Sequence, residues 1–424
     1  MSLSVGIDLG TSACRVAVID ESNQLLYLSR VDLPAPTTNG LHCEQAPTDW
    51  WQACQLALND ALSHVDKARV ATIAVDGTSS TLLLCDANGQ PSGPALMYRD
   101  QRAQQQVDRI NRFAPSAAAV HSASSSLAKL LWFKDQKQLK TGLKALHQAD
   151  WIAGRLRGCF DTSDENNALK LGYNAKQRGW PKWLSKLDLP EGCLPTVVPA
   201  GQRLGKVAPE ISRQFGLMPD CQVVAGTTDS TASFIASGAK NVGDAVTVLG
   251  STLVIKVLSE QPIFDPKLGV YSHRLGNHWL VGGASNSGGA VLTQFFSLEQ
   301  IEMLSSEINP TKPTTLDYMP LPARGERFPV NNPDLAPNFE PRPPNDVDFL
   351  QALLTSIAKI EQQGYETLAK LGAPLPLSIR SSGGGAKNKA WQAIRQQLLT
   401  TTFLKPTHEE AAVGAAMLAA SSKI

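Results

Sequence analysis

The sequence predicts an α/β protein built from two similar halves. Short apolar strands alternate with amphipathic helices, a pattern typical of sheets covered by helices. A strand–turn–strand unit occurs twice, with Leu9-Gly10-Thr11-Ser12 at the first turn and Leu249-Gly250-Ser251-Thr252 at the second. This weak internal repeat favours two related halves. The length of 424 residues agrees, because it corresponds to two or three domains of roughly 150 residues.

Composition excludes several other classes of protein. The chain has 39 Lys+Arg and 38 Asp+Glu, a net charge of +1, so it lacks the basic excess of a dedicated nucleic-acid binder. With 42% hydrophobic and 18% charged residues, it is not a disordered chain. No apolar run approaches the roughly 20 residues of a membrane span, and the start MSLSVGIDLG lacks a basic region and a cleavage site. We therefore expect a cytoplasmic protein without a nucleic-acid or membrane partner.

The cysteines indicate neither a disulfide framework nor a structural metal site. The chain has seven of them, dispersed and without a CxxC pair or a His/Cys cluster at zinc spacing. We expect reduced, buried thiols. The cysteines are Cys14, Cys43, Cys54, Cys85, Cys159, Cys193 and Cys221.

The first 238 residues predict a strand-rich start, a helical middle and a return to strand and helix. Alternation of apolar and polar residues predicts strands at 5–9, 15–19, 25–28, 70–75, 82–85 and 221–225. Thr48 is the expected N-cap of an amphipathic helix carrying Leu56, Leu58 and Leu62. We expect residues 100–204 to be mostly helical with polar loops. Residues 226–228 are expected to form a turn, with a helix from Asp229 to Gly238.

The remaining residues repeat the hairpin and then become helical. Strands are expected at 245–249, 253–257 and 377–379, and helices over 349–368, 391–399 and 409–420. Residues 309–344 contain ten prolines and cannot be regular helix, because an interior proline removes a hydrogen bond and clashes with the preceding turn. The halves differ in one residue of their hairpins: Asp8 precedes the first turn and Val248 the second. Chemistry that requires this carboxylate therefore belongs to the first half.

Three glycine-bearing turns, at 10–12, 250–252 and 383–385, each follow a predicted strand. Turns of this kind expose backbone N–H groups, and adjacent hydroxyls add donors, so they can bind phosphate oxygens. The alternative is a plain turn in which glycine supplies a positive φ. The chain has no GxxxxGK[ST] sequence. Three such turns in one chain, two of them in repeated context, favour phosphate binding.

Two aspartates have both a structural and a chemical interpretation. Asp8 could form a salt bridge to Arg15 across the hairpin, or bind, through water, the Mg²⁺ ion that accompanies a nucleoside triphosphate. Asp229 could be a helix N-cap, as Thr228 also could, or a general base directed at a substrate hydroxyl. The residues alone leave both pairs of alternatives open.

Two polar segments follow apolar strands, Asp76-Gly77-Thr78-Ser79 and Tyr98-Arg99-Asp100-Gln101-Arg102. In α/β sheets, ligands bind beyond the carboxyl ends of strands. Alternatively, the polar residues of either segment could simply form a turn or a surface ion pair.

Together these elements resemble the FGGY family of carbohydrate kinases over nearly the whole chain. The matching motifs occur in the family's order: Gly6-Ile7-Asp8-Leu9-Gly10-Thr11-Ser12, Gly226-Thr227-Thr228-Asp229, Leu249-Gly250-Ser251-Thr252, Gly383-Gly384-Gly385-Ala386-Lys387-Asn388 and Glu410-Ala411-Ala412-Val413-Gly414. The resemblance implies the actin/hexokinase/heat-shock-type ATPase fold, with two similar domains and an intervening cleft. Residues 1–238 would hold the sugar, the first phosphate motif and the catalytic base, and residues 239–424 the second phosphate motif and the adenosine motif.

The resemblance also implies roles for individual residues. Asp229 would be the base that takes the proton from the sugar's terminal hydroxyl, and Asp8 would help to hold Mg²⁺ and contact the sugar. The sugar would further be bound by Asp76, Ser79 and Asp100. ATP would be bound by Gly10, Thr11, Ser12, Arg15, Gly250, Ser251, Thr252, Gly384, Gly385 and Asn388.

The expected reaction is phosphorylation of a ketopentose by ATP. Xylulose kinases of the family usually carry a Met-His pair in the loop where this chain has Asp76-Gly77-Thr78-Ser79, and an Asp-x-Thr-Ser loop is more similar to the ribulose kinases. Tyr98 stands where many relatives have Trp. We therefore expect a D-ribulose kinase, similar to the short cyanobacterial and plastid pentulose kinases, with D-xylulose as the alternative substrate. An actin-like ATPase or a non-catalytic sugar-binding protein is a more distant alternative.

Overall fold

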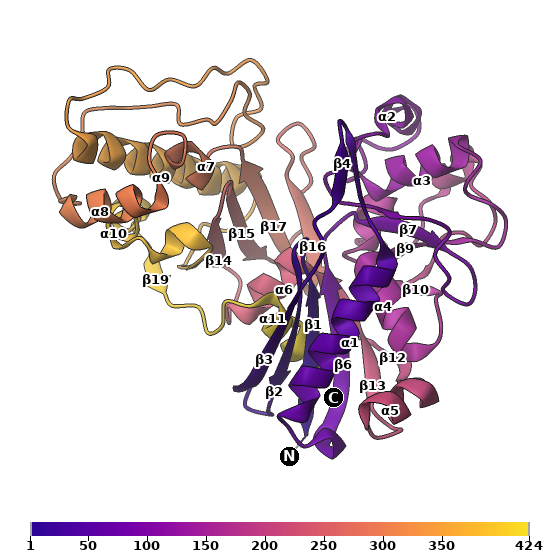
Figure 1. The fold of residues 1–424 in the computed structure, drawn as a ribbon. Coiled ribbons are helices and arrows are strands. Elements are labelled where there is room, and N and C mark those ends of the chain that lie inside the picture. The colour runs from indigo at the N-terminus through magenta and orange to yellow at the C-terminus, as the bar shows by residue number, and fades with distance from the viewer. Residues whose placement is uncertain (1, 423–424) are drawn as a thin grey trace. The chain divides into compact units, whose positions relative to one another are not determined.

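The computed structural model describes residues 2–422 and divides into two compact units (Figure 1). The first unit contains the chain up to Gly238, residues 273–276 and the C-terminal segment from His408. The second contains Ala239–Ser272 and Asn277–Thr407. The first unit thus includes the C-terminal segment, which the sequence analysis assigned to the second half.

The first unit is built on a mixed sheet with the strand order β12-β13-β6-β1-β2-β3. Its strands are β1 (Leu3–Leu9), β2 (Ala13–Ile19), β3 (Leu25–Asp32), β6 (Val70–Gly77), β12 (Arg203–Lys206) and β13 (Gln222–Thr228). The hairpin β1–β2 is antiparallel, whereas β6 runs parallel to both β1 and β13. The carboxyl ends of β1, β6 and β13 therefore lie at one edge of the sheet.

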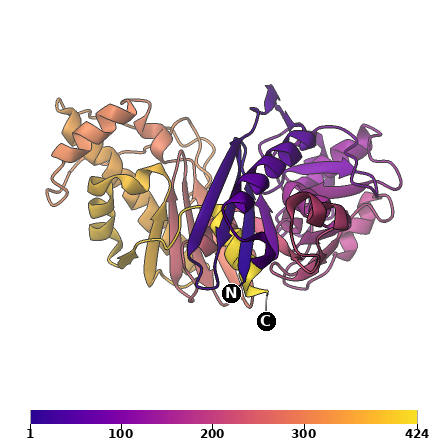
Figure 2. The ribbon, with the colours of Figure 1, turned by 60° about the horizontal axis from the view of Figure 1, so that its bottom comes forward.

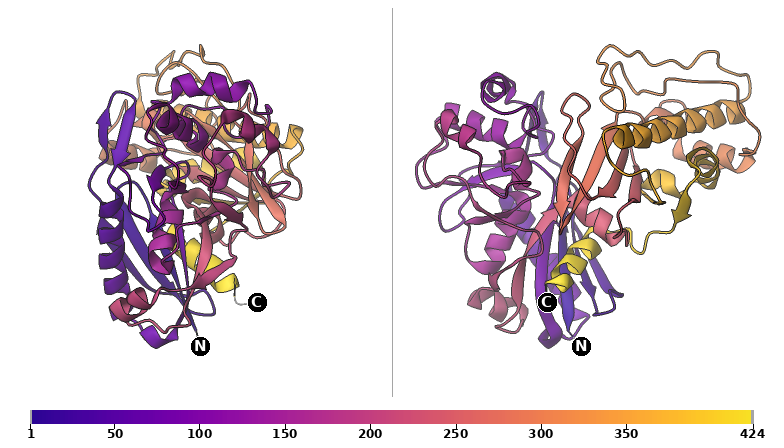
Figure 3. Two further views of the ribbon diagram at one scale, coloured as in Figure 1. Left: turned by 90° about the vertical axis from the view of Figure 1, so that its right-hand side faces the viewer. Right: turned by 180° about the vertical axis from the view of Figure 1, so that it is seen from behind.

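Helices cover both faces of this sheet. They are α1 (Pro47–Ser63), α4 (Gln148–Arg157), α5 (Pro209–Phe215), α6 (Asp229–Ala236) and α11 (Ala411–Ser421). Val5, Ile7 and Leu9 of β1 point into a core shared with α1 and α4, and Figure 2 shows α1 lying along the indigo strands. The alternate residues of β1 face α11, which Figure 3 shows against the same strands from the other side.

The contact between α11 and its neighbours is a close backbone approach. A Cβ at Gly6 of β1 would overlap the carbonyl oxygen of Ala412, and a Cβ at Gly414 of α11 would overlap the carbonyl oxygen of Ala232 in α6. Glycine at these two positions thus lets one helix pack closely on both the strand and the helix that begins at Asp229.

A smaller layer completes the first unit. It contains a five-stranded sheet of β4 (Thr37–Asn39), β5 (His42–Gln45), β8 (Ala95–Leu96), β7 (Leu82–Cys85) and β9 (Lys144–His147), and the pair β10 (Thr162–Asp164) and β11 (Thr196–Val198). Its longer helices are α2 (Gln104–Asn111) and α3 (Ser126–Asp135). Buried leucines of β7 and β8 pack against Leu130 and Phe133 of α3.

The second unit contains a sheet with the strand order β16-β17-β15-β14-β18-β19. The strands are β14 (Asp244–Leu249), β15 (Leu253–Ser259), β17 (His278–Ser285), β18 (Ser378–Ser382) and β19 (Thr402–Leu404); β16 (Tyr271–Leu275) lies where the chain passes between the units. The helices are α7 (Gly289–Leu292), α8 (Leu298–Glu307), α9 (Asp346–Lys370) and α10 (Lys389–Leu399). Phe349, Leu353 and Ile357 of α9 belong to its core.

Both hairpins, the proline-rich loop and the long helix after it are confirmed. Four expectations are wrong. The first helix begins at Pro47 after Ala46, because proline at N1 is preorganised for a helix. Residues 226–228 continue β13 as a bulged strand rather than a turn. Residues 100–204 are not mostly helical, since α2–α4 alternate with strands and long loops. The helix from Asp229 ends at Ala236, not at Gly238.

Within residues 2–422, no helix combines the length and the apolar composition needed to cross a membrane.

We predict that Gly6→Ala destabilises the first unit by about 1–3 kcal/mol or more, because the new methyl group meets the α11 backbone and not a flexible side chain. Gly93→Ala is the matched control, because Gly93 is exposed and a Cβ at this position would meet no atom within 4 Å. Thermal melting of both variants checks the prediction, and a Gly6→Ala protein that melts like Gly93→Ala would contradict the close packing.

Candidate active site

Three aspartates meet at the edge of the first unit's sheet. Asp8 lies in β1 directly opposite Asp76 in β6, and Asp76 is in register with Thr227 of β13. Asp229 begins α6 immediately after β13. Asp8 and Asp76 are buried. The parallel pairing of β1, β6 and β13 thus brings together Asp229, the predicted base, Asp8, the predicted Mg²⁺ ligand, and Asp76, a predicted sugar contact.

Burial controls the protonation of this group. Removal from water raises the pKa of Asp8, although Asp76 and Arg15 oppose the rise. Burial and the negative charges of Asp8 and Asp229 raise the pKa of Asp76 well above its usual range. No hydrogen-bond partner among residues 2–422 reaches either Asp76 oxygen, and the raised pKa favours the neutral form of this carboxyl.

Arg15 bridges Asp8 to the C-terminal segment. Its Nη1 lies 3.2 Å from Asp8 Oδ2, and its Nε lies 3.3 Å from Glu410 Oε2. The salt bridge considered for Asp8 is therefore present, and it leaves the Mg²⁺ role of Asp8 and the phosphate role of Arg15 as predictions. Glu410 was not given a role from the sequence, because about 400 positions separate it from Arg15 and no local pattern links them.

Asp229 is not the N-cap of its helix. The cap position is Thr228, and Asp229 Oδ1 accepts a hydrogen bond from the backbone N–H of Ser230 at 2.6 Å. An N-cap function therefore does not account for Asp229, and its first-turn position places the carboxylate at the positive end of α6.

The turns at 10–12 and 250–252 leave backbone donors open. Neither Gly10 nor Gly250 has a positive φ, and a Cβ would meet only ordinary contacts at either position. The plain-turn alternative, glycine needed for a positive φ, does not explain them. Among the described residues, none accepts a hydrogen bond from the N–H of Thr11, Ser12, Ser251 or Thr252.

The second unit brings its two predicted nucleotide turns side by side. Gly383 directly follows β18 and has φ +84°, and a Cβ there would come within 2.7 Å of the Leu249 carbonyl oxygen. Gly384 has open space around it. Asn388 caps α10, since its Oδ1 accepts from the Trp391 N–H at 3.0 Å and its Nδ2 donates to Ser305 Oγ at 2.8 Å. Its predicted adenosine contact stays a prediction.

With the residues that adjoin them, the two polar segments of the first unit span 76–81 and 97–102, and in this extent they are hydrogen-bonded to each other. The Tyr98 N–H donates to Thr81 Oγ1 at 3.0 Å, and Thr78 Oγ1 lies 2.8 Å from Gln148 Oε1. Ser79 is partly exposed and Tyr98 is 42% exposed. These segments form one local structure, in which Gln148 was not anticipated from the sequence.

Asp100 is fully buried and already paired. It accepts from the Cys43 N–H at 2.6 Å and from Arg102 Nη2 at 2.7 Å. Arg102 in turn contacts Glu44 at 2.7 Å. The structure therefore uses Asp100 to fix the segment, and its sugar contact stays a prediction.

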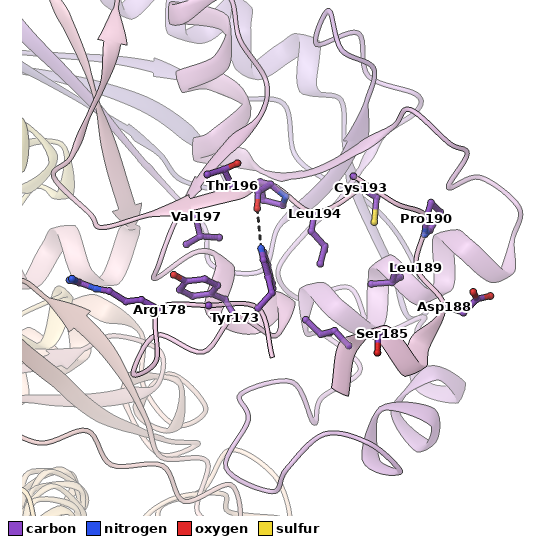
Figure 4. A pocket seen from close by; sticks show the side chains of 15 residues that line it. Tyr173, Arg178, Ser185, Asp188, Leu189, Pro190, Cys193, Leu194, Thr196 and Val197 are labelled. Atoms are coloured by element: carbon purple, nitrogen blue, oxygen red, sulfur yellow. Dashed lines mark hydrogen bonds between the residues drawn. The ribbon is translucent and has the colours of Figure 1, made fainter. Parts of the chain in front are cut away.

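A separate cavity of about 650 Å³ lies in the first unit (Figure 4). Tyr173 and Trp180 pack edge to face on its wall, and Trp180 Nε1 donates to the Pro195 carbonyl oxygen at 3.2 Å. None of the predicted site residues lines it.

Family models match both parts of the chain. The N-terminal domain of the FGGY family of carbohydrate kinases matches residues 3–236, and its C-terminal domain matches residues 245–422. The chain belongs to this family. It is an ATP-dependent carbohydrate kinase, a phosphotransferase, with the family's two-domain, actin-like ATPase fold.

Named relatives agree with this class. A xylulose kinase of Staphylococcus xylosus is 24% identical, with 99% of this chain and 91% of the relative covered. A gluconokinase of Bacillus subtilis is 21% identical, with coverages of 98% and 87%. A xylulose kinase structure from Brucella ovis aligns with TM-score 0.90 at 22% identity, with coverages of 100% and 91%. A Plasmodium falciparum glycerol kinase with ADP aligns with TM-score 0.86 at 16% identity, with coverages of 100% and 90%.

A buried ion pair underlies the turns of the second unit. Arg395 of α10 donates from Nε to Glu361 of α9 at 2.6 Å and from Nη1 to Ser381 of β18 at 2.8 Å. Glu361 also accepts from Thr247 of β14. The network therefore joins the two strands that lead into the turns at 250 and 383.

We predict that Arg395→Met lowers the free energy of unfolding by about 3–5 kcal/mol, because it leaves the Glu361 carboxylate buried and unpaired. The double variant Arg395→Met/Glu361→Leu should be more stable than the single one, since it removes both charges. Denaturant unfolding followed by fluorescence measures both. A double variant less stable than the single variant would show that the unpaired charge is not the cause.

Proposed function

We propose that the protein transfers the γ-phosphoryl group of ATP to the terminal hydroxyl of D-ribulose, giving D-ribulose 5-phosphate. The observation that carries the proposal is the aspartate group at the sheet edge, with Asp229 next to the paired Asp8 and Asp76. The loop that follows Asp76 supports D-ribulose, because its sequence resembles that of ribulose kinases and lacks the Met-His pair of xylulose kinases.

Asp229 is the general base in this proposal. The raised pKa of Asp76 favours its neutral form, which lessens the negative charge beside Asp229. Asp229 accepts the hydroxyl proton as the sugar oxygen attacks phosphorus, and ADP leaves. Phosphoryl transfer depends mostly on positioning and charge stabilisation. The N–H groups of the turns at 10–12 and 250–252 position the phosphates and stabilise their negative charge. Ser79 and Asp76 bind the sugar, and the turn at 383–388 binds the adenosine.

The residues fit a Mg²⁺ ion that arrives with ATP. Within residues 2–422, no group of three His, Cys, Asp or Glu side chains could hold a metal ion. Mg²⁺ commonly uses one or two carboxylates, several waters and substrate phosphates. Asp8 is the carboxylate that would hold it, and the ion would supply charge neutralisation at the phosphates.

D-Xylulose is the second candidate substrate, favoured by relatives that are named xylulose kinases. A coupled ADP assay with D-ribulose, D-xylulose, L-ribulose and glycerol, each with and without Mg²⁺, decides between them. We expect Mg²⁺-dependent ADP release that is fastest with D-ribulose. A higher kcat/KM with D-xylulose would overturn the D-ribulose assignment, and sugar-independent ADP release would favour an ATPase.

We predict that Asp229→Asn lowers the phosphorylation rate by about 10² to 10⁴, because the amide cannot accept the hydroxyl proton. Stability should fall by less than about 1 kcal/mol, the usual value of a first-turn carboxylate near a helix N-terminus. Asp220→Asn is the control, because Asp220 is exposed and lies before β13. The assay is run beside thermal melting, and near-parent turnover of a normally melting Asp229→Asn protein would end the base assignment.

A further inference from the structure

Lys129 is a buried lysine that is not among the predicted site residues. It lies in α3 between Ala128 and Leu130, and its side chain is fully buried. A buried ammonium is costly unless its donors are satisfied. Here Nζ donates to the carbonyl oxygen of Ser80 at 2.8 Å and to that of Met97 at 2.7 Å.

These two carbonyls belong to the two polar segments of the first unit. Ser80 follows Ser79, and Met97 precedes Tyr98. Lys129 therefore ties the segments together, in addition to the bond from the Tyr98 N–H to Thr81 Oγ1.

The backbone at Ser80 requires such support. Its φ is +70°, in the left-handed region that costs a residue with a side chain free energy unless surrounding contacts impose it. The Lys129 ammonium holds the carbonyl of this residue directly. Loss of that bond would let Ser80 relax toward negative φ and would move the neighbouring Ser79.

We propose that Lys129 is a positioning residue for the sugar, whose two hydrogen bonds fix the segments 76–81 and 97–102 in the geometry that binds the substrate. This inference rests on the proposed function, because it takes these segments as the sugar contacts. Lys129 itself is too deeply buried to touch the substrate.

The electrostatic surroundings of Lys129 agree with this role. Burial lowers its pKa to about 7. The charged and titratable groups around it are Asp100 and Cys43, which oppose the fall, and Lys170 and Arg102, which add to it. A neutral amine keeps two N–H groups, as many as the two carbonyls require. Positioning should therefore persist on both sides of pH 7.

The experiment compares Lys129→Met with Lys134→Met. Lys134 lies in the same helix, and its Nζ donates to the Leu187 carbonyl oxygen and to Asp188, away from both segments. We expect Lys129→Met to raise the KM for the sugar at least tenfold, with the KM for ATP changed less than twofold and kcat less than threefold. Lys134→Met should leave all three near the parent values.

Titration gives a second measurement. An unfolded lysine has its pKa near 10.5, so between pH 7 and pH 10 the unfolded chain binds a proton that folded Lys129 does not. The parent's Tm should therefore rise relative to that of Lys129→Met across this window. A difference in Tm that does not change with pH would show that the pKa of Lys129 is not lowered by burial, and would overturn the enclosed environment from which the positioning role is inferred.

The outcomes separate the two proposals. An active parent whose folded Lys129→Met variant keeps the parent KM for sugar, or loses sugar and ATP affinity equally, overturns the positioning role alone. A parent without sugar-dependent ADP release overturns the proposed function and this inference with it. If Lys129→Met does not fold, Lys129→Gln takes its place, because the shorter amide cannot reach both carbonyls. An unchanged sugar KM in a folded Lys129→Gln protein overturns the proposal.

Discussion

The close approach of α11 to β1 and α6 is the constraint on which the first unit depends. Glycine at positions 6 and 414 removes the side chains that would separate the backbones. The same approach brings Glu410, which precedes α11, to Arg15 and thereby to Asp8. The last segment of the chain thus completes the environment of a residue in its first strand. It also fixes α6, whose first residue is Asp229.

Strand pairing explains why costly carboxylates lie together. In a parallel sheet, residues at equivalent positions of neighbouring strands share one edge, so an aspartate near the end of β1 and another near the end of β6 must face each other. Two ionised carboxylates at this distance and depth would repel strongly. The raised pKa of Asp76 favours a neutral carboxyl beside Asp8, and Arg15 forms a salt bridge with Asp8.

Local patterns predicted most of the strands and helices, because apolar alternation and proline positions act over a few residues. The hairpins at 3–19 and 244–259 and the helix after the proline-rich loop are examples. Long-range consequences could not be read in this way. Glu410 contacts Arg15 only because α11 returns to the first unit. Asp100 accepts hydrogen bonds from Arg102 and from the Cys43 N–H, and Cys43 belongs to the distant strand β5. Local sequence treats Asp8, Asp76 and Asp229 as separate features, and only the family resemblance assigns all three to the sugar. In the structure, strand register brings them together. Lysine usually indicates an exposed helix face, so nothing in the sequence marked Lys129 as buried.

In each unit the backbone of the turn is held so that its N–H donors stay open, but the contacts that hold it differ between the units. In the first unit the turn at 10–12 is held at its ends, where Gly10 N–H donates to the Ala13 carbonyl oxygen and Ser12 accepts from Leu33 N–H. In the second, the turn at 250–252 is held by the start of α7, since Gly289 N–H donates to the Gly250 carbonyl oxygen, and the buried Arg395–Glu361 pair fixes the strands beneath it. Donors that are already oriented do not have to reorganise when charge develops on the phosphate. Under the proposed function, the supports beneath these turns contribute to phosphate binding as much as the turns themselves, and Lys129 is the corresponding support for the two polar segments.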